Sequence, residues 1–203
     1  MSPNPAPLTL KQTEIADAAL KIIGERGIAA LTTPALAQEL GVSSGAPFRH
    51  FASRDRILEA AAQRVAELVG ATYPEASLPP LDRLRALFAA RVSAVGERAG
   101  VARFIFSDQF ALALPPAAGE RMLGVVRDTR AFVLQALEQA AERGEIRRDL
   151  SSAELLHVVL GSLQHLVFLS ALPLGLGKAP AATEVFHSLA CLLAPNPSLE
   201  SKP

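Results

Sequence analysis

The sequence predicts an all-α fold of about nine helices, and three observations support this. Half of the 203 residues are apolar but only 5% are aromatic, with Ala and Leu abundant, a composition typical of packed helices. Apolar residues recur at the spacing that places them on one helix face. Between these segments lie the capping residues, glycines and prolines that start and stop helices. The length allows one large domain or two small ones.

The first predicted helix begins after Thr9. Thr9 and Gln12 have the spacing of a capping box, in which each side chain bonds the other residue's backbone N–H. Gly24 and Gly27 bracket the end of this helix. Its apolar residues form one stripe: Ile15, Ala16, Ala19, Leu20 and Ile23. We therefore expect an amphipathic helix that buries this stripe.

Two short helices and a longer one should follow. Thr32 and the nearby Pro34 start a second helix over 35–40, and Gly41 ends it. Ser43 caps a third short helix, which we expect from Ala46 to about residue 51. A fourth helix is capped by serine at position 53. Two short helices joined by a Gly-containing turn predict a helix-turn-helix, whose second helix enters the DNA major groove.

The stretch from Leu31 to Phe51, in the printed sequence LTTPALAQELGVSSGAPFRHF, resembles the DNA-binding signature of the TetR family of transcriptional regulators. The match extends back through the first helix and forward to Leu58. The resemblance implies that residues 43–50 form the recognition helix. The residues that it assigns to DNA contact are Thr32, Ser43, Ser44, Gly45, Ala46, Pro47, Phe48, Arg49, His50 and Arg54.

Physical chemistry gives these residues separate roles. Hydroxyls at helix N-termini, such as that of Thr32, bind phosphate oxygens. The small residues 44–46 allow close approach to base edges, and Pro47 can pack on a thymine methyl. By resemblance, His50 and Arg54 hold phosphates. Phe48 departs from the family, which usually has a tyrosine there, and this loses one hydrogen bond of about 0.5–1.5 kcal/mol.

Five further helices are predicted in the rest of the chain. They should span about 81–97, 100–112, 118–143, 151–172 and 180–193, and Ser151 with Glu154 forms a second capping box. The predicted division is a DNA-binding domain over 1–52, a ligand-binding and dimerisation domain over 53–194, and a disordered tail over 195–203.

The last two predicted helices are expected to pair with those of a second copy. The eighth helix is apolar nearly all round, so it should be buried on several sides. A symmetric dimer would let two recognition helices bind a palindromic double-stranded operator whose half-sites lie about 34–36 Å apart or a multiple of that distance.

A small, mostly apolar effector is expected between the fifth and eighth helices, although the same residues could simply fill the core. The candidate lining residues are Phe88, Arg91, Arg103, Phe104, Phe106, Phe110, Met122, Gln164, His165 and Phe168. Polar members of this set would orient the ligand.

Several other classes of protein are disfavoured. Twenty basic residues balance twenty acidic ones, so any DNA contact must be a local patch. The single cysteine, Cys191, fits a reducing cytoplasm, and the N-terminus lacks the pattern of a secretory signal. We expect no membrane span, metal, cofactor or enzymatic activity. Two alternatives stay open: an effector-independent DNA-organising or division-control protein, and a helical enzyme or carrier in which the turn is only structural.

Overall fold

The computed structural model describes residues 6–96, 98–106, 112–171 and 179–195, and within these ranges the chain is helical without strands. Eight α-helices lie there: α1 (Leu10–Arg26), α2 (Thr33–Leu40), α3 (Arg54–Gly70), α4 (Pro80–Arg91), α5 (Ala99–Phe106), α7 (Pro116–Glu142), α8 (Ser152–Ala171) and α9 (Ala182–Leu193). Short 3₁₀ turns η1 (Ile28–Ala30) and η2 (Pro47–Arg49) and a π-helical turn η3 (Val92–Gly96) accompany them. The all-α prediction is confirmed for this part of the chain.

The chain forms two compact units. The first comprises residues 1–68 and 98–123, and the second comprises 69–97 and 124–203. Residues 107–111 and 196–203 lie outside the described residues, so the predicted end of the sixth helix and most of the predicted tail do too. Each unit is described below on its own.

Local capping chemistry fixes α1 as the sequence predicts. The Thr9 N–H donates to Gln12 Oε1 at 3.0 Å, and the Gln12 N–H donates to Thr9 Oγ1 at 3.3 Å. At the other end Gly27 has φ +83°, a conformation that residues with a Cβ atom rarely adopt. The helix is therefore defined at both ends by nearby residues.

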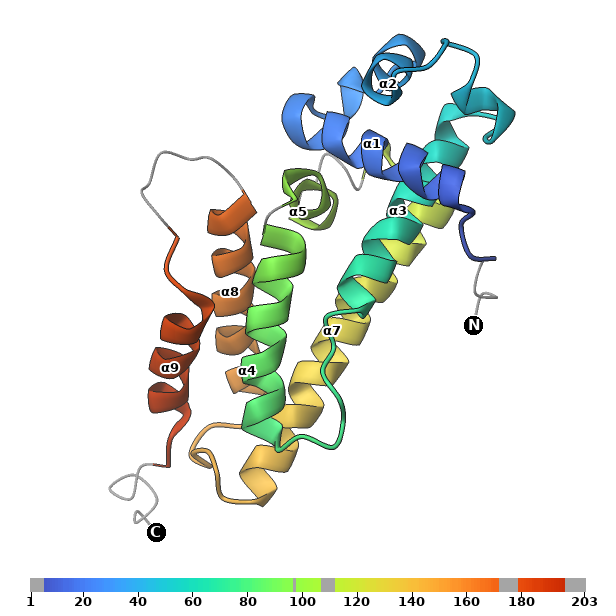
Figure 1. The fold of residues 1–203 in the computed structure, drawn as a ribbon. Coiled ribbons are helices and arrows are strands. Elements are labelled where there is room, and N and C mark those ends of the chain that lie inside the picture. Colours follow the sequence, from blue (N-terminus) through green and yellow to red (C-terminus); the bar gives the residue numbers. More distant parts are fainter. Residues whose placement is uncertain (1–5, 97, 107–111, 172–178, 196–203) are drawn as a thin grey trace. The chain divides into compact units, whose positions relative to one another are not determined.

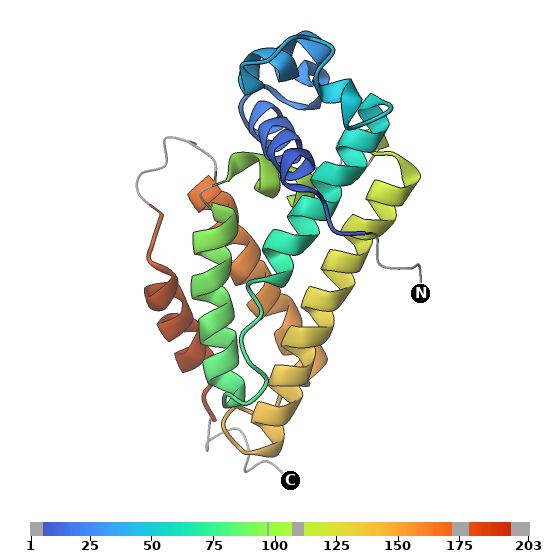
Figure 2. The same ribbon diagram turned by 45° about the vertical axis from the view of Figure 1, so that its right-hand side comes forward.

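The turn after α2 is also the predicted one, but the third element is shorter than predicted. Gly41 is left-handed with φ +65°, and the Val42 N–H donates to the Ala37 carbonyl at 3.0 Å. Instead of an α-helix over 46–51, residues after Ser43 make turns and then the single 3₁₀ turn η2. Serines and glycine are weak helix formers, and Pro47 lacks a backbone donor, so one short turn is what this segment supports. Figure 2 shows α1, α2 and η2 gathered together, and we call residues 10–52 the head.

A glycine contact joins α1 to α5 within the first unit. Gly24 lies on α1 and Gly100 on α5, and a Cβ atom added to Gly100 would overlap the carbonyl group of Leu20. A Cβ atom at Gly24 would overlap the backbone of Gly100. The two backbones therefore touch without intervening side chains, as the crossing of α1 and α5 in Figure 1 also indicates. We call this contact the glycine seam.

The second unit packs α4, η3, α8 and α9 together (Figure 1). Phe88 of α4 is fully buried, and its ring centre lies 5.4 Å from that of Phe186 on α9 in an edge-to-face arrangement. The predicted fifth helix over 81–97 is only partly correct. It is α-helical to Arg91 and then widens into the π-helical turn.

Helix α8 is less enclosed than its composition predicts. Eight of its residues, including Leu156 and Leu163, are buried, but Val158 is 49% exposed on the opposite side. It is also the one helix of the described chain long and apolar enough to cross a membrane, by length and composition alone. Its contacts with η3 and α9 give a packing reason for that composition. The expected burial on several sides includes burial by a second copy; within one chain, the side of α8 that carries Val158 faces solvent.

Candidate nucleic-acid interface

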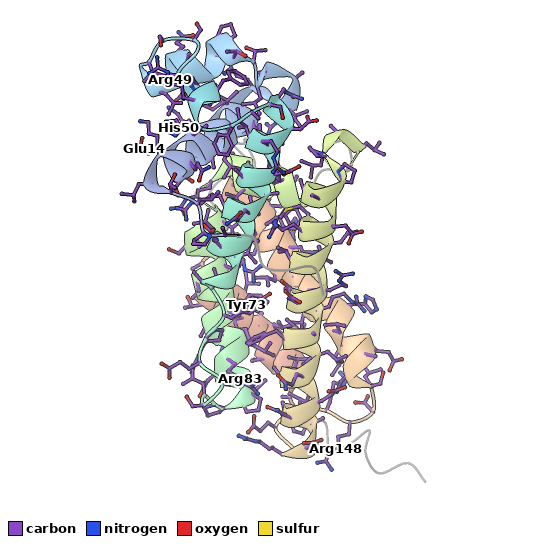
Figure 3. All side chains as sticks on the ribbon, turned by 90° about the vertical axis from the view of Figure 1, so that its right-hand side faces the viewer. Glu14, Arg49, His50, Tyr73, Arg83 and Arg148 are labelled. Atoms are coloured by element: carbon purple, nitrogen blue, oxygen red, sulfur yellow. The ribbon has the colours of Figure 1, made fainter. Side chains whose placement is uncertain are left out.

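The predicted recognition segment, residues 43–50, lies on the surface of the head. Ser43, Ser44 and Gly45 are exposed, as are the side chains of Arg49 and His50. Figure 3 shows Arg49 and His50 together at the end of the first unit. Polar groups and small residues therefore face solvent on both sides of Ala46 and Pro47. This surface can approach a nucleic acid without moving the backbone.

Two members of the segment face inward. Pro47 is buried and Ala46 is half-buried, while Phe48 is 38% exposed. The predicted contact between Pro47 and a thymine methyl therefore conflicts with the position of its ring. Phe48 leaves more of an apolar side chain at the surface than Pro47 does. Phe51, which follows the segment, is buried.

The basic residues of this region differ in what they already bind. Arg54 Nε donates to the Leu31 carbonyl at 3.0 Å, and its Nη2 donates to the Ile28 carbonyl at 2.9 Å. Arg56 forms an ion pair of 2.5 Å with Glu59. Arg54 is thus held in place by the chain between α1 and α2, a role that sequence patterns did not reveal.

Arg49 is the contrasting case. Among the described residues it has no carboxylate within ion-pair distance, and its side chain is exposed next to His50. The backbone carbonyl of His50 accepts a hydrogen bond of 3.5 Å from Gln12 Nε2 on α1. The free cation of Arg49 is available to a phosphate group, while His50 is tied to α1 through its backbone.

Thr32 combines a structural and a surface role. Its Oγ1 accepts a long hydrogen bond of 3.4 Å from the Ala35 N–H, and so caps α2. The residue is exposed, and a hydroxyl that accepts a bond can still donate its own proton. Beside a helix N-terminus, that proton and the free backbone N–H groups are suited to an anion.

The predicted ligand-binding residues are distributed over both units. Arg103, Phe104, Phe106 and Met122 belong to the first unit, whereas Phe88, Arg91, Gln164, His165 and Phe168 belong to the second. Gln164, His165 and Phe168 are exposed on the outer side of α8, so they do not line an interior cavity of one chain. Phe110 lies outside the described residues.

Arg91 is the predicted ligand residue with the most unusual surroundings. Its side chain is buried, and its Nε donates to Thr72 Oγ1 at 2.9 Å. The guanidinium carbon lies 5.4 Å from the ring centre of Tyr73, and Nη2 has no partner among the residues that the structure describes. Burial lowers the pKa of Arg91 and the neighbouring Tyr73 opposes this shift. Thr72 and Tyr73 were missed from the sequence; the one tyrosine of the chain, directly before a proline, was the available signal.

Comparisons with known proteins agree with this geometry. The family model for bacterial regulatory proteins of the tetR family matches residues 15–61. Over 147 residues, 69% of this chain and 71% of the relative, the sequence is 26% identical to the HTH-type transcriptional repressor KstR2 of Mycobacterium tuberculosis.

Solved structures show the same fold over nearly the whole chain. The ketosteroid transcriptional regulator KstR2 of Mycobacterium tuberculosis has a TM-score of 0.73 at 20% identity, covering 93% of this chain and 97% of that one. A regulatory protein of the tetR family from Rhodococcus RHA1 has a TM-score of 0.74 at 18% identity, with 92% and 98% covered. AibR, solved with isovaleryl coenzyme A and operator DNA, has a TM-score of 0.72 at 16% identity, with 90% and 97% covered.

The fold and the exposed head define a class: an all-helical transcriptional regulator with an N-terminal helix-turn-helix DNA-binding domain and a helical C-terminal domain. Residues 15–61 match the DNA-binding domain of the tetR family of bacterial regulatory proteins, and the fold of the chain is similar to that of solved regulators of this family. The matched proteins are transcription regulators rather than enzymes.

Proposed function

We propose that this regulator is a repressor, which binds a palindromic operator as a homodimer and is released when a small, mostly apolar molecule binds its C-terminal domain. The observation that carries the proposal is the exposure of the segment of residues 43–50. This segment includes Arg49, which forms no ion pair with any described residue. The relative KstR2 is named a transcriptional repressor, and AibR was solved with both an acyl thioester and operator DNA.

The proposed contacts follow from exposure and from the bonds already made. Arg49, His50 and Thr32 contact phosphates and fix the position of the head on the duplex. Ser44 and Gly45 come closest to base edges, with the side chain of Phe48 next to them. Arg54 supports this surface through the hydrogen bonds that its Nε and Nη2 donate to two backbone carbonyls. It reaches DNA only with the part of its guanidinium that these two bonds leave free.

The second copy is proposed to pack on the outer faces of α8 and α9. Val158 and Phe168 are exposed on α8 and Leu192 on α9, and Gly161 lies between the first two with nothing near it. Exposed apolar side chains around a glycine fit a close helix pair, because a glycine lets two backbones approach. Two copies then make a four-helix interface.

In this proposal residues 1–52 bind DNA, and residues 53–194 bind the ligand and form the dimer. The protein acts in the cytoplasm, where the DNA is. Ligand binding releases DNA only if the ligand prefers the conformation whose heads do not fit the operator. An effector-independent DNA-organising protein would have no such preference.

Selection of bound duplexes from a random pool tests the proposal. A palindromic consensus is expected, and its affinity should fall steeply as salt rises, because bound phosphates release counterions. Arg49→Ala should lower the affinity for all duplexes and reduce the salt slope by about one unit. Arg26, an exposed arginine at the end of α1, provides the matched control as Arg26→Ala. A protein that selects no sequence from the pool would contradict the proposal.

A further inference from the structure

Two arginines of the second unit are buried without a carboxylate near them. Arg83 is 4% exposed and Arg91 is 6% exposed, and neither forms an ion pair with any described residue. A guanidinium keeps its proton in proteins, so its burial leaves a positive charge in a poorly polar environment. Such a charge is costly unless an anion accompanies it, and no carboxylate of the described residues does so here.

The surroundings of Arg91 lack an acceptor rather than a donor. The Thr72 hydroxyl donates to the Val69 carbonyl at 2.6 Å, and its oxygen accepts from Arg91. The Thr129 hydroxyl donates to the Val125 carbonyl, so in the 2.9 Å bond between Tyr73 and Thr129 the tyrosine must be the donor. The hydroxyls of Thr72, Tyr73 and Thr129 therefore each donate a hydrogen bond to another group of the protein. The group left without a partner is Arg91 Nη2.

The geometry at Arg91 also selects the kind of anion. Nε is engaged by Thr72, the guanidinium carbon lies 5.4 Å from the ring centre of Tyr73, and Nη2 is buried without a partner among the described residues. Nη2 can donate to a carboxylate oxygen, and a hydrogen bond between two charged groups is stronger than one between neutral groups. Phe88, one turn earlier on α4, is buried in an aromatic contact, so apolar groups surround this end of the helix.

Arg83 offers a contrast on the same helix. One of its Nη atoms donates to the side-chain oxygen of Gln139 on α7, and only its Nε lacks a partner. Its terminal edge is thus occupied by a carboxamide of the chain itself. Arg83 and Arg91 match in residue type, helix and burial, but Nη2 of Arg83 donates to a carboxamide oxygen, whereas Nη2 of Arg91 has no partner among the described residues.

We infer that Arg91 binds the carboxylate of an amphipathic organic acid, and that Thr72 and Tyr73 position its guanidinium for this contact. The inference rests on the proposed function, because it names the chemical class of the effector that the proposal requires. It does not depend on release from DNA, since the acid would bind the isolated regulator as well. Tyr73 in turn is held by Thr129 and by Phe132, whose ring centre lies 5.1 Å from that of Tyr73.

The test compares acids with neutral analogues on the full-length protein. Thermal unfolding and calorimetric titration would use butanoate, octanoate and dodecanoate, the matching primary amides, sulfate, and octanoyl-coenzyme A. We expect at least one acid to raise Tm while its amide does not. Arg91→Met should weaken binding of that acid at least about tenfold, and Arg83→Met should leave it within about twofold.

The ligand-free variants give a second, independent measurement. Arg91→Met removes an unpaired buried charge and keeps an apolar side chain of similar length, so its Tm should equal or exceed that of the wild type. A lower Tm would show that Arg91 serves only the fold and would overturn the inference. So would a response to amides equal to that to acids, or a response confined to sulfate or the coenzyme A thioester.

Operator binding, measured separately on the selected duplex, distinguishes this inference from the proposed function. If acids bind through Arg91 but do not release DNA, the carboxylate site stands and release by ligand is wrong. If neutral compounds release DNA equally from the wild type and from Arg91→Met, release by ligand stands and the carboxylate site is wrong.

Discussion

The two units of the chain differ in how completely they satisfy their own groups. In the first, α1 and α2 are capped, Arg54 has two backbone acceptors, and the glycine seam leaves no space between α1 and α5. In the second, Arg91 keeps an unpaired nitrogen and apolar side chains of α8 face solvent. Among the described residues the first unit also leaves one buried nitrogen, Arg103 Nε, without a partner. The second unit combines an unpartnered guanidinium nitrogen with the exposed apolar side of α8, and these are the contacts that we propose for a ligand and another subunit. Mutations can test this difference.

The largest effect is expected at the proposed subunit interface. Val158→Asp places a charge where the partner's helices would cover it, and an unpaired buried charge costs about 3–5 kcal/mol. Sedimentation analysis should show a monomer, with operator affinity falling accordingly. Val126→Asp is the matched control, because Val126 is also exposed, at 41% against 49% for Val158, but lies on α7. Equal behaviour of the two variants would contradict an interface on α8.

The glycine seam should give the next largest effect. Gly100→Ala adds a methyl group that overlaps the Leu20 carbonyl, so α1 and α5 must separate, at a cost of about 3 kcal/mol. Gly119→Ala provides a control of opposite sign. Gly119 lies within α7 with nothing near its Cβ position, so alanine should stabilise the protein by about 0.5–1 kcal/mol. Chemical denaturation measures both, and destabilisation by both variants would argue against a specific seam.

A smaller effect is expected from Arg54→Ala. It removes two hydrogen bonds from a charged donor to the carbonyls of Leu31 and Ile28, and because the group is partly exposed we expect a loss of about 1–2 kcal/mol in stability. Operator affinity should fall with it. Arg56→Ala, which breaks only a surface ion pair with Glu59, should change stability by less than about 0.5 kcal/mol. A loss of DNA binding without any loss of stability would show that Arg54 contacts DNA and does not support the head.

The helices that the sequence predicted correctly are those whose ends depend on neighbouring residues. Thr9 with Gln12 and Ser151 with Glu154 both form their predicted capping boxes. Gly41 adopts the left-handed conformation that its position after α2 predicted. These signals are contained within a few residues, so one sequence is enough to detect them.

The errors concern contacts between distant segments. Whether Gln164 faces a cavity or solvent depends on which side of α8 meets η3 and α9, and the uniform apolar composition of α8 does not encode this. The partners of Arg54 are 23 and 26 residues away, and Thr72 is 19 residues from Arg91. No periodicity in the sequence records such pairs. The shortened third element is a separate case, because the residues that disfavour an α-helix there, Pro47 and the preceding Ser-Ser-Gly, lie within the segment itself.

The smallest predicted effect is a gain in DNA affinity from Phe48→Tyr. The side chain is 38% exposed on the recognition segment, so a hydroxyl added to the ring can reach solvent or a phosphate without entering the core. One additional hydrogen bond contributes about 0.5–1.5 kcal/mol, which corresponds to an affinity about two- to twelvefold higher. Phe51→Tyr is the control, because Phe51 is buried and a hydroxyl there would disturb packing without reaching DNA. If Phe48→Tyr left the affinity unchanged in a titration with the selected operator, position 48 would lie beyond reach of a phosphate. The proposed orientation of residues 43–50 on the duplex would then be wrong.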